Sequence, residues 1–360
     1  MSTPTPRPRA TVATIPAYVP GKPPVARDGM QTFKLSSNEN PYPPLPGVLD
    51  AVATAAAQMN RYPDMGCVGL YDALATRLGV EPDQLAAATG SVAVLYHLLQ
   101  AYCDPGDEVV YAWRSFEAYP IAVSVVGATS VQVPLTSDAR HDLDAMAAAI
   151  TERTKVVVLC SPNNPTGPAL SHDEVRRFVD RVPGEVLVVV DEAYREFVRM
   201  DDPLDGLALA RERANVVAMR TFAKAYGLAG LRVGYLVGHE EVAGAVRACA
   251  LPFGVSSVAQ AAAIASLAAE AELLARVELL AEERARVVEA LTNQGWELPD
   301  AQGNFVWFAL GDRTLEFAAA AEEAGIVVRP FAGDGVRVSI GEVEANNRLI
   351  DVASVLVPTA

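Results

Sequence analysis

The strongest constraint on the fold is a regular alternation of short apolar runs and helix-like segments between residues 86 and 237. The runs are rich in Val, Leu and Ala, and a helix-like segment separates each from the next. They lie near residues 86–89, 108–112, 130–134, 155–160, 186–190, 216–219 and 233–237. Strands that alternate with helices in this way are typical of a mostly parallel sheet. The sequence therefore predicts an α/β fold with a mostly parallel sheet of seven strands.

The segments on either side of this alternation divide the chain into three predicted parts. A Pro-rich N-terminal arm covers residues 1–30, a large domain covers 31–255, and a smaller α+β domain covers 256–360. Proline excludes a regular helix or a central strand from the arm. We expect helices at 48–58 and 68–78 in the large domain and one or two helices at 257–293. The small domain has candidate strands at 305–309, 326–329 and 335–340.

Composition excludes several classes of protein. The 360 residues carry a net charge of −15, which is the wrong sign for binding nucleic acid. The four cysteines are far apart and predict neither a disulfide framework nor a metal site. Neither a signal peptide nor a strongly apolar stretch of about 18 residues is present, so we expect no membrane partner. A cytoplasmic location is the expectation, since the cytosol keeps thiols reduced.

Residues 221–232 place a lysine and an arginine at the end of one predicted strand. Lys224 follows the run at 215–220, and Arg232 comes eight residues later, after a Gly-rich turn. Ligands bind at the carboxyl ends of strands in such sheets. A lysine with a lowered pKa attacks carbonyls, pyridoxal phosphate is its usual partner, and a nearby arginine suits the cofactor phosphate. Two solvated surface charges are the alternative that this stretch alone leaves open.

Two other strand ends carry polar groups of the kind that such a cofactor needs. Asp191 follows the run at 186–190, where a carboxylate would keep a pyridinium nitrogen protonated. Tyr194 would donate to the phenolate oxygen of the cofactor. The segment 161–167, Ser-Pro-Asn-Asn-Pro-Thr-Gly, rigidly presents an amide that can reach the same oxygen. Taken singly, the alternatives are a helix cap, a half-buried tyrosine and a plain turn.

Two further segments supply groups for the phosphate and the ring. Residues 89–95, Thr-Gly-Ser-Val-Ala-Val-Leu, run from a strand into a helix whose first amides would bind a phosphate. Residues 113–119 follow the strand at 108–112, and an aromatic ring there would stack on the pyridine. A position in the core is the alternative for these aromatic residues.

Together these motifs resemble the fold type I pyridoxal-phosphate aminotransferases. The matching segments are 38–41, 60–63, 161–167, 191–194, 221–232 and 335–341, in the order of that family and over nearly the whole chain. Within this fold type the chain resembles the histidinol-phosphate aminotransferase family, and more closely its actinobacterial branch of aromatic (phenylalanine) aminotransferases. The resemblance implies amino transfer between aromatic L-amino acids, such as phenylalanine and tyrosine, and 2-oxo acids such as 2-oxoglutarate.

The resemblance also implies a role for each matching residue of the reaction centre. Lys224 would hold the cofactor, pyridoxal 5'-phosphate, as a Schiff base and would move the proton during the reaction. Asp191 would pair with the pyridine nitrogen, and Phe116 would stack on the ring. Asn164 and Tyr194 would bind the phenolate oxygen.

The phosphate and the substrate have their own implied residues. The positions that would bind the phosphate are Ser91, Val92, Thr221 and Arg232. Tyr62 matches a tyrosine that reaches this phosphate from the neighbouring subunit, so the resemblance implies a homodimer. Arg337 would grip the substrate carboxylate or, in histidinol phosphate, the phosphate, and an arginine fork suits either group. Tyr18 and Asn40 would close over the substrate.

The chain departs from the family at one phosphate contact and leaves the substrate open. Ala223 stands where the family usually has serine, so we expect weaker retention of the cofactor by roughly 0.5–1.5 kcal/mol, the worth of a lost hydrogen bond. Histidinol-phosphate aminotransferase is the alternative activity, and a decarboxylase of the same fold is a third. A transcription regulator with this fold is disfavoured, because the chain has no room for a DNA-binding module before residue 30.

Overall fold

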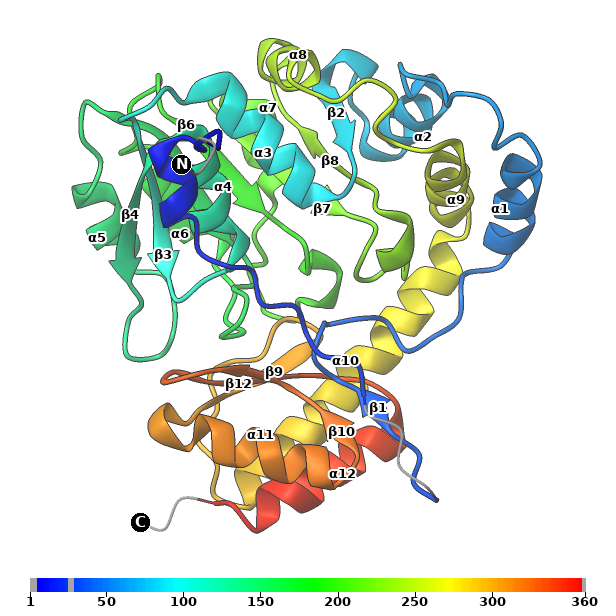
Figure 1. The fold of residues 1–360 in the computed structure, drawn as a ribbon, viewed down its shortest axis with the longest axis vertical. Coiled ribbons are helices and arrows are strands. Elements are labelled where there is room, and N and C mark those ends of the chain that lie inside the picture. Colours follow the sequence, from blue (N-terminus) through cyan, green and yellow to red (C-terminus); the bar gives the residue numbers. More distant parts are fainter. Residues whose placement is uncertain (1–4, 25–28, 358–360) are drawn as a thin grey trace.

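The computed structural model describes residues 5–24 and 29–357, and its largest element is a seven-stranded sheet (Figure 1). The strand order is β2-β8-β7-β6-β5-β3-β4. The five strands from β7 to β4 run parallel, and β8 is antiparallel to both of its neighbours. The predicted sheet is therefore confirmed. Its strands are β2 (Leu85–Ala88), β3 (Glu108–Trp113), β4 (Thr129–Pro134), β5 (Thr154–Cys160), β6 (Leu187–Asp191), β7 (Val216–Thr221) and β8 (Gly234–Val237).

Both faces of this sheet are buried, which explains why its central strands are continuously apolar. In β6, Val188 and Val190 pack with α5, α6 and α7 on one face, whereas Val189 packs with α3, α4 and α8 on the other. The covering helices are α3 (Ser91–Tyr102), α4 (Ala118–Val126), α5 (Leu143–Ala148), α6 (His172–Val179), α7 (Gly206–Glu212) and α8 (Glu240–Ala248). Because the strands are parallel, the groups that follow β3, β5, β6 and β7 meet at one edge of the sheet.

A second, smaller sheet lies beneath the large one in Figure 1. It contains β9 (Phe305–Ala309), β11 (Arg329–Phe331) and β12 (Gly335–Ser339) in the antiparallel order β11-β12-β9. Helices α11 (Thr314–Glu323) and α12 (Val343–Ser354) accompany it. The boundaries that we placed after residues 30 and 255 stay a prediction.

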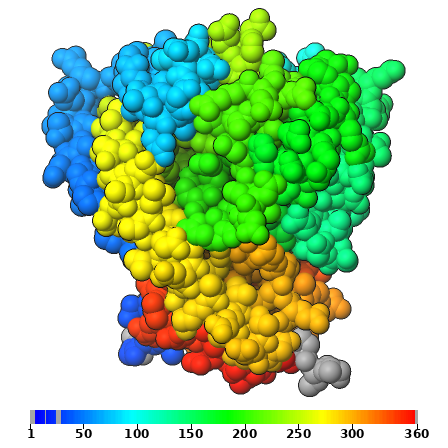
Figure 2. Space-filling view, turned by 180° about the vertical axis from the view of Figure 1, so that it is seen from behind, coloured from blue at the N-terminus to red at the C-terminus, as the bar shows by residue number. Residues whose placement is uncertain are grey.

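The predicted helical region at 257–293 forms two helices. They are α9 (Ser257–Ala268) and α10 (Glu270–Asn293), with a bend of 81° between them. Helix α9 packs against α1 (Val48–Ala56) and α2 (Val68–Leu78). Helix α1 ends at Ala56, two residues before the predicted end at residue 58. In Figure 2 the yellow surface of α9 and α10 extends from the upper part of the molecule to the lower. Within the described residues no single helix could cross a membrane, and only this bent pair has the necessary length and composition.

The prediction of one strand at 326–329 is wrong. Ile326 and Val327 form β10 (Ile326–Val327), which pairs in parallel with β1 (Phe33–Lys34), and β11 begins at Arg329 in the other sheet. The apolar run is interrupted at Val328 because its two halves have different partners. One of these partners lies almost 300 positions earlier in the chain, so local sequence cannot reveal the break.

The N-terminal arm follows the surface of the large part before it reaches the region between the two sheets (Figure 1). It contains one short 3-10 helix, η1 (Ala10–Thr14), against α4. The side chain of Arg9 donates a hydrogen bond to the carbonyl oxygen of Val125. Further along, Tyr18 and Gly21 reach the cavity described below.

Candidate active site

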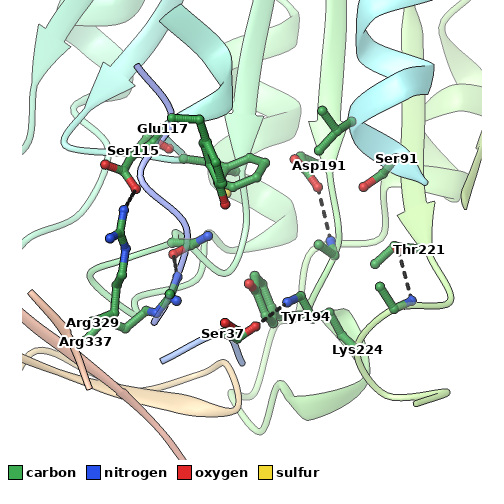
Figure 3. A pocket seen from close by; sticks show the side chains of 18 of the residues that line it. Ser37, Ser91, Ser115, Glu117, Asp191, Tyr194, Thr221, Lys224, Arg329 and Arg337 are labelled. Carbon is green, nitrogen blue, oxygen red and sulfur yellow. Dashed lines mark hydrogen bonds and ion pairs between the residues drawn. The ribbon is translucent and has the colours of Figure 1, made fainter. Parts of the chain in front are cut away.

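A cavity lies where the carboxyl ends of the large sheet's strands face the small sheet (Figure 3). Its walls come from β5, β6 and β7, from the segment after β3, from the start of α3, and from β11 and β12. Most of the predicted site residues line it: Tyr18, Ser91, Val92, Phe116, Asn164, Asp191, Tyr194, Thr221, Lys224, Arg232 and Arg337. The fold thus brings together groups that are spread over more than 300 positions of the chain.

Lys224 projects from the turn after β7 into this cavity. Its Nζ donates a hydrogen bond to the carbonyl oxygen of Ser37 at 2.9 Å and lies 5.6 Å from the ring centre of Tyr194. Burial, together with the positive charge of Arg337, lowers the pKa of Lys224 from 10.5 to about 7. At neutral pH a substantial fraction of the molecules therefore carries Lys224 as the free amine, which is the nucleophilic form.

Asp191, the last residue of β6, holds a buried carboxylate without a cationic partner. Its Oδ2 accepts a hydrogen bond from the Tyr119 hydroxyl at 2.7 Å, and Oδ1 accepts one from the Ala193 backbone at 3.3 Å. No ion pair of Asp191 with Lys, Arg or His occurs within the described part of the chain. Burial raises the pKa of this carboxyl to about 6, against the lowering effect of Tyr119. A cationic ligand group beside it would favour the ionised form.

Arg337 is a second buried charge, and part of its guanidinium is unsatisfied. Nη1 donates to Asn164 Oδ1 at 2.5 Å and Nη2 donates to the Ser36 carbonyl oxygen at 2.7 Å. Nε is buried and has no hydrogen-bond partner among the described residues, and burial lowers the pKa of Arg337. A buried donor without a partner costs about 1–3 kcal/mol. An anionic ligand that accepted from this side chain would remove that cost.

Tyr194 lines the same cavity as Lys224 and Arg337, and its phenol keeps its proton. Its hydroxyl accepts a hydrogen bond from Asn38 Nδ2 at 3.0 Å, and burial raises the pKa of the phenol. The side chain is 3% exposed, so it is more deeply buried than an ordinary half-buried tyrosine. The hydroxyl is available as a donor to an oxygen in the cavity.

At another side of the cavity, Arg232 lies against the N-terminus of α3. Gly90 precedes this helix with a φ of 90°, and a Cβ built there would come within 2.5 Å of Arg232 Nη2. Glycine is therefore needed at this position for both conformation and space. The first amides of α3, at Ser91 and Val92, and the guanidinium form a site suited to an anion.

Comparisons with known proteins agree with this geometry. The sequence profile of "Aminotransferase class I and II" matches residues 31–352. A relative from Streptomyces avermitilis, named aromatic amino acid aminotransferase, is 61% identical over 352 residues and covers 98% of each chain. A relative of the same name from Thermobifida fusca is 54% identical over 345 residues, or 96% of each chain. The chain belongs to the class I and II aminotransferases.

A solved structure supports the same fold for this aminotransferase. Histidinol-phosphate aminotransferase from Sinorhizobium meliloti, in complex with pyridoxal 5'-phosphate, superimposes with a TM-score of 0.83 at 29% identity. The match covers 91% of this chain and 93% of the other. The cofactor of class I and II aminotransferases is pyridoxal 5'-phosphate.

The residues of this aminotransferase fit that cofactor. The phosphate, the pyridine nitrogen and the aldehyde of pyridoxal 5'-phosphate each have a counterpart in the cavity: an anion site at Arg232 and α3, a buried carboxylate at Asp191, and the amine of Lys224. Thr221 also lines the cavity, but its hydroxyl accepts from the Ala223 backbone at 3.1 Å. Ala223 itself contributes no polar side-chain atom.

Asn40 and Tyr62 are not among the residues that line the cavity of this single subunit. Asn40 Nδ2 donates to the carbonyl oxygen of Ala225 at 2.8 Å and so supports the turn that carries Lys224. Tyr62 is 82% exposed and stacks on Phe253, with ring centres 4.6 Å apart. The predicted contacts of Asn40 with the substrate and of Tyr62 with a second subunit's phosphate stay predictions.

Sequence reasoning did not identify several residues of this aminotransferase site. Tyr119, Ser37 and Asn38 contact predicted residues directly, and Glu117, Arg329 and Phe331 line the cavity. Tyr119 and Glu117 lie close to Phe116 in the chain, but no pattern separates them from core or surface residues. Asn38 belongs to a motif that we had singled out, although only Asn40 was given a role.

Proposed function

We propose that this chain is a pyridoxal-phosphate-dependent transaminase that moves the amino group between aromatic L-amino acids, such as phenylalanine and tyrosine, and 2-oxo acids such as 2-oxoglutarate. The observation that carries the proposal is the buried guanidinium of Arg337, whose Nε has no hydrogen-bond partner among the described residues, in a cavity that also holds the amine of Lys224. The rings of Phe116 and Phe331 line the same cavity and suit an aromatic side chain. The names of the Streptomyces and Thermobifida relatives support the aromatic substrate.

The proposed mechanism assigns a task to each of these side chains. When bound, pyridoxal 5'-phosphate supplies an aldehyde that accepts the amino group and a ring that withdraws electrons from the α-carbon. Arg337 binds the substrate carboxylate and so fixes the α-carbon near Lys224. Lys224 Nζ would act as general base and acid for the proton at the substrate α-carbon. Asp191 would hold the proton on the pyridine nitrogen of the bound cofactor, and Asn164 and Tyr194 would donate to its phenolate oxygen.

We also propose that the active unit is a homodimer. Tyr62 is exposed on the segment between α1 and α2, beside Arg61 and Pro63. In the proposed dimer the Tyr62 hydroxyl would donate to the cofactor phosphate in the second subunit. Each phosphate would also be bound by residues of its own subunit: Ser91, Val92, Thr221 and Arg232. A cytoplasmic location is part of the proposal, and four free cysteines suit that reducing compartment.

A substrate panel on the purified, cofactor-loaded protein tests the proposal. Initial rates with L-phenylalanine and L-tyrosine, with 2-oxoglutarate as acceptor, should exceed those with L-histidinol phosphate, L-aspartate and L-alanine. Lys224→Ala should abolish turnover with every amino acid. Transamination of none of the aromatic substrates, or undiminished turnover by Lys224→Ala, would refute it.

Histidinol phosphate is the second candidate substrate, and one observation favours it. Arg329 and Arg337 are cross-strand partners in β11 and β12, and both line the cavity. Two guanidinium groups side by side suit a phosphate. A kcat/KM for histidinol phosphate above that for phenylalanine would select this activity.

A further inference from the structure

Two arginines on neighbouring strands face the cavity, and within residues 5–24 and 29–357 only Arg329 forms an ion pair with a carboxylate. Arg329 and Arg337 lie directly opposite each other in β11 and β12, and each is 7% exposed. Arg329 Nη2 lies 2.5 Å from Glu117 Oε2 (Figure 3). Among the described residues, the side chain of Arg337 donates hydrogen bonds to the neutral oxygen atoms of Asn164 and Ser36 and forms no ion pair, although the charge of Glu117 acts on it weakly. One positive charge is therefore compensated within the protein, and the other is available to a ligand.

Glu117 comes from the opposite wall of the cavity. It lies in the segment between β3 and α4 and lines the cavity together with its neighbour Phe116. The carboxylate is partly buried, with 26% of the side chain exposed. Near it, the guanidinium of Arg329 lies 5.1 Å from the ring centre of Phe331. Apart from Arg337, this part of the cavity thus contains aromatic rings and the Glu117–Arg329 ion pair, which has no net charge.

We propose that Glu117 determines substrate specificity by occupying Arg329, so that the cavity favours amino acids with an uncharged aromatic side chain over those with a second anionic group. The proposal rests on the proposed function and names the residue that sets its substrate class. An incoming carboxylate or phosphate must either displace Glu117 from Arg329 or lie beside its negative charge. An aromatic side chain does neither.

The same effect applies to both halves of the transamination. Glutamate and 2-oxoglutarate carry a second carboxylate, so they must open the Glu117–Arg329 pair before the second carboxylate can bind Arg329. Phenylalanine and phenylpyruvate leave the pair closed. Removing the charge of Glu117 should therefore improve dicarboxylic substrates relative to aromatic ones, because Arg329 becomes available as a charged hydrogen-bond donor.

The test is a set of single half-reactions of the cofactor-loaded enzyme, followed by the absorbance change of the cofactor. Glu117→Gln keeps the size of the side chain and removes its charge. We expect this variant to raise the ratio of kcat/KM for L-glutamate over kcat/KM for L-phenylalanine about 10-fold, the factor that one gained charged contact gives. The ratio for histidinol phosphate over phenylalanine should rise in the same direction.

Two further variants make the result specific to the proposed pair. Asp334→Asn removes a neighbouring ion pair, Arg114–Asp334, which also joins the segment after β3 to the β11–β12 region but does not line the cavity. It should leave both ratios at their wild-type values. Adding Arg329→Gln to Glu117→Gln should abolish the gain for glutamate. The proposal is overturned if Glu117→Gln leaves the ratios unchanged, or if Asp334→Asn changes them equally.

Binding of unreactive acids separates this proposal from the proposed function. The dissociation constants of maleate, a dicarboxylate, and 3-phenylpropionate, an aromatic monocarboxylate, are measured by cofactor absorbance. Glu117→Gln should strengthen the binding of maleate about 10-fold relative to the binding of 3-phenylpropionate, which is again the factor for one charged contact. Wild-type protein that transaminates no aromatic substrate refutes the function, whereas unchanged relative binding in Glu117→Gln refutes the role of Glu117.

Discussion

Replacing Arg337 gives the sharpest test of how the cavity binds its substrate. The guanidinium has five N–H donors. The hydrogen bonds to Asn164 and Ser36 use two of them, and Nε has no partner in the described ranges of the chain. A carboxylate can therefore take two donors from one edge of the fork, each contact contributing about 1.5–3 kcal/mol. We expect Arg337→Gln to lose about 4 kcal/mol of transition-state binding, which lowers kcat/KM about 1,000-fold.

Arg337→Lys serves as the matched variant, because it keeps the charge and loses the fork. We expect it to recover about half of that free energy, so its kcat/KM should fall about 30-fold. Steady-state kinetics with L-phenylalanine measure both variants, and the absorbance of the bound cofactor shows that its site is intact. A kcat/KM for Arg337→Gln within about threefold of wild type, less than one charged contact is worth, would contradict the assignment.

Three other predictions concern the cofactor site. Because the pKa of Lys224 is lowered to about 7, the rate at which apoenzyme binds pyridoxal 5'-phosphate covalently should rise with pH and level off above pH 7; continued rise toward the ordinary lysine pKa would contradict this. Ala223→Ser should tighten cofactor binding about 3- to 10-fold by restoring one hydrogen bond, and equal dissociation constants in a fluorescence titration would exclude that contact. In the folded apoenzyme the pKa of Asp191 is about 6, whereas the ordinary pKa of this group is 3.8. Between these two values the folded protein holds the proton that the unfolded protein has lost, so the free energy of unfolding should fall as the pH rises from the lower value to the higher. Tyr119→Phe removes a bond that lowers the pKa of Asp191, so it should extend the fall to higher pH in chemical denaturation; an identical pH profile would show that the hydroxyl does not act on Asp191.

The parts of the fold that the sequence predicted are those with a local cause. The central strands of the large sheet are apolar runs because both of their faces are covered, as at Val188, Val189 and Val190 in β6. The ends of these strands carry Asp191 and Lys224, and parallel pairing brings such ends to one edge. Position along the chain was therefore sufficient to predict that these residues meet.

Other features depend on partners that are distant in the chain. The break at Val328 exists because β10 pairs with β1 and β11 pairs with β12. Tyr119 reaches Asp191 from a separate helix, although an isolated tyrosine after a strand predicts nothing about a carboxylate 72 positions later.

The sequence by itself determined the family, the order of the strands along the chain and the residues suited to hold the cofactor, because short-range pattern and residue type encode these properties. Only the tertiary structure decided which charges in the cavity are compensated. Arg329 and Arg337 have the same side chain on neighbouring strands, yet in the part of the chain that the structure describes Arg329 pairs with Glu117, whereas Arg337 donates its hydrogen bonds to neutral oxygens. Whether the charge of an arginine is compensated depends on which groups the fold places within a few ångströms of it, since the attraction between charges decreases with their separation.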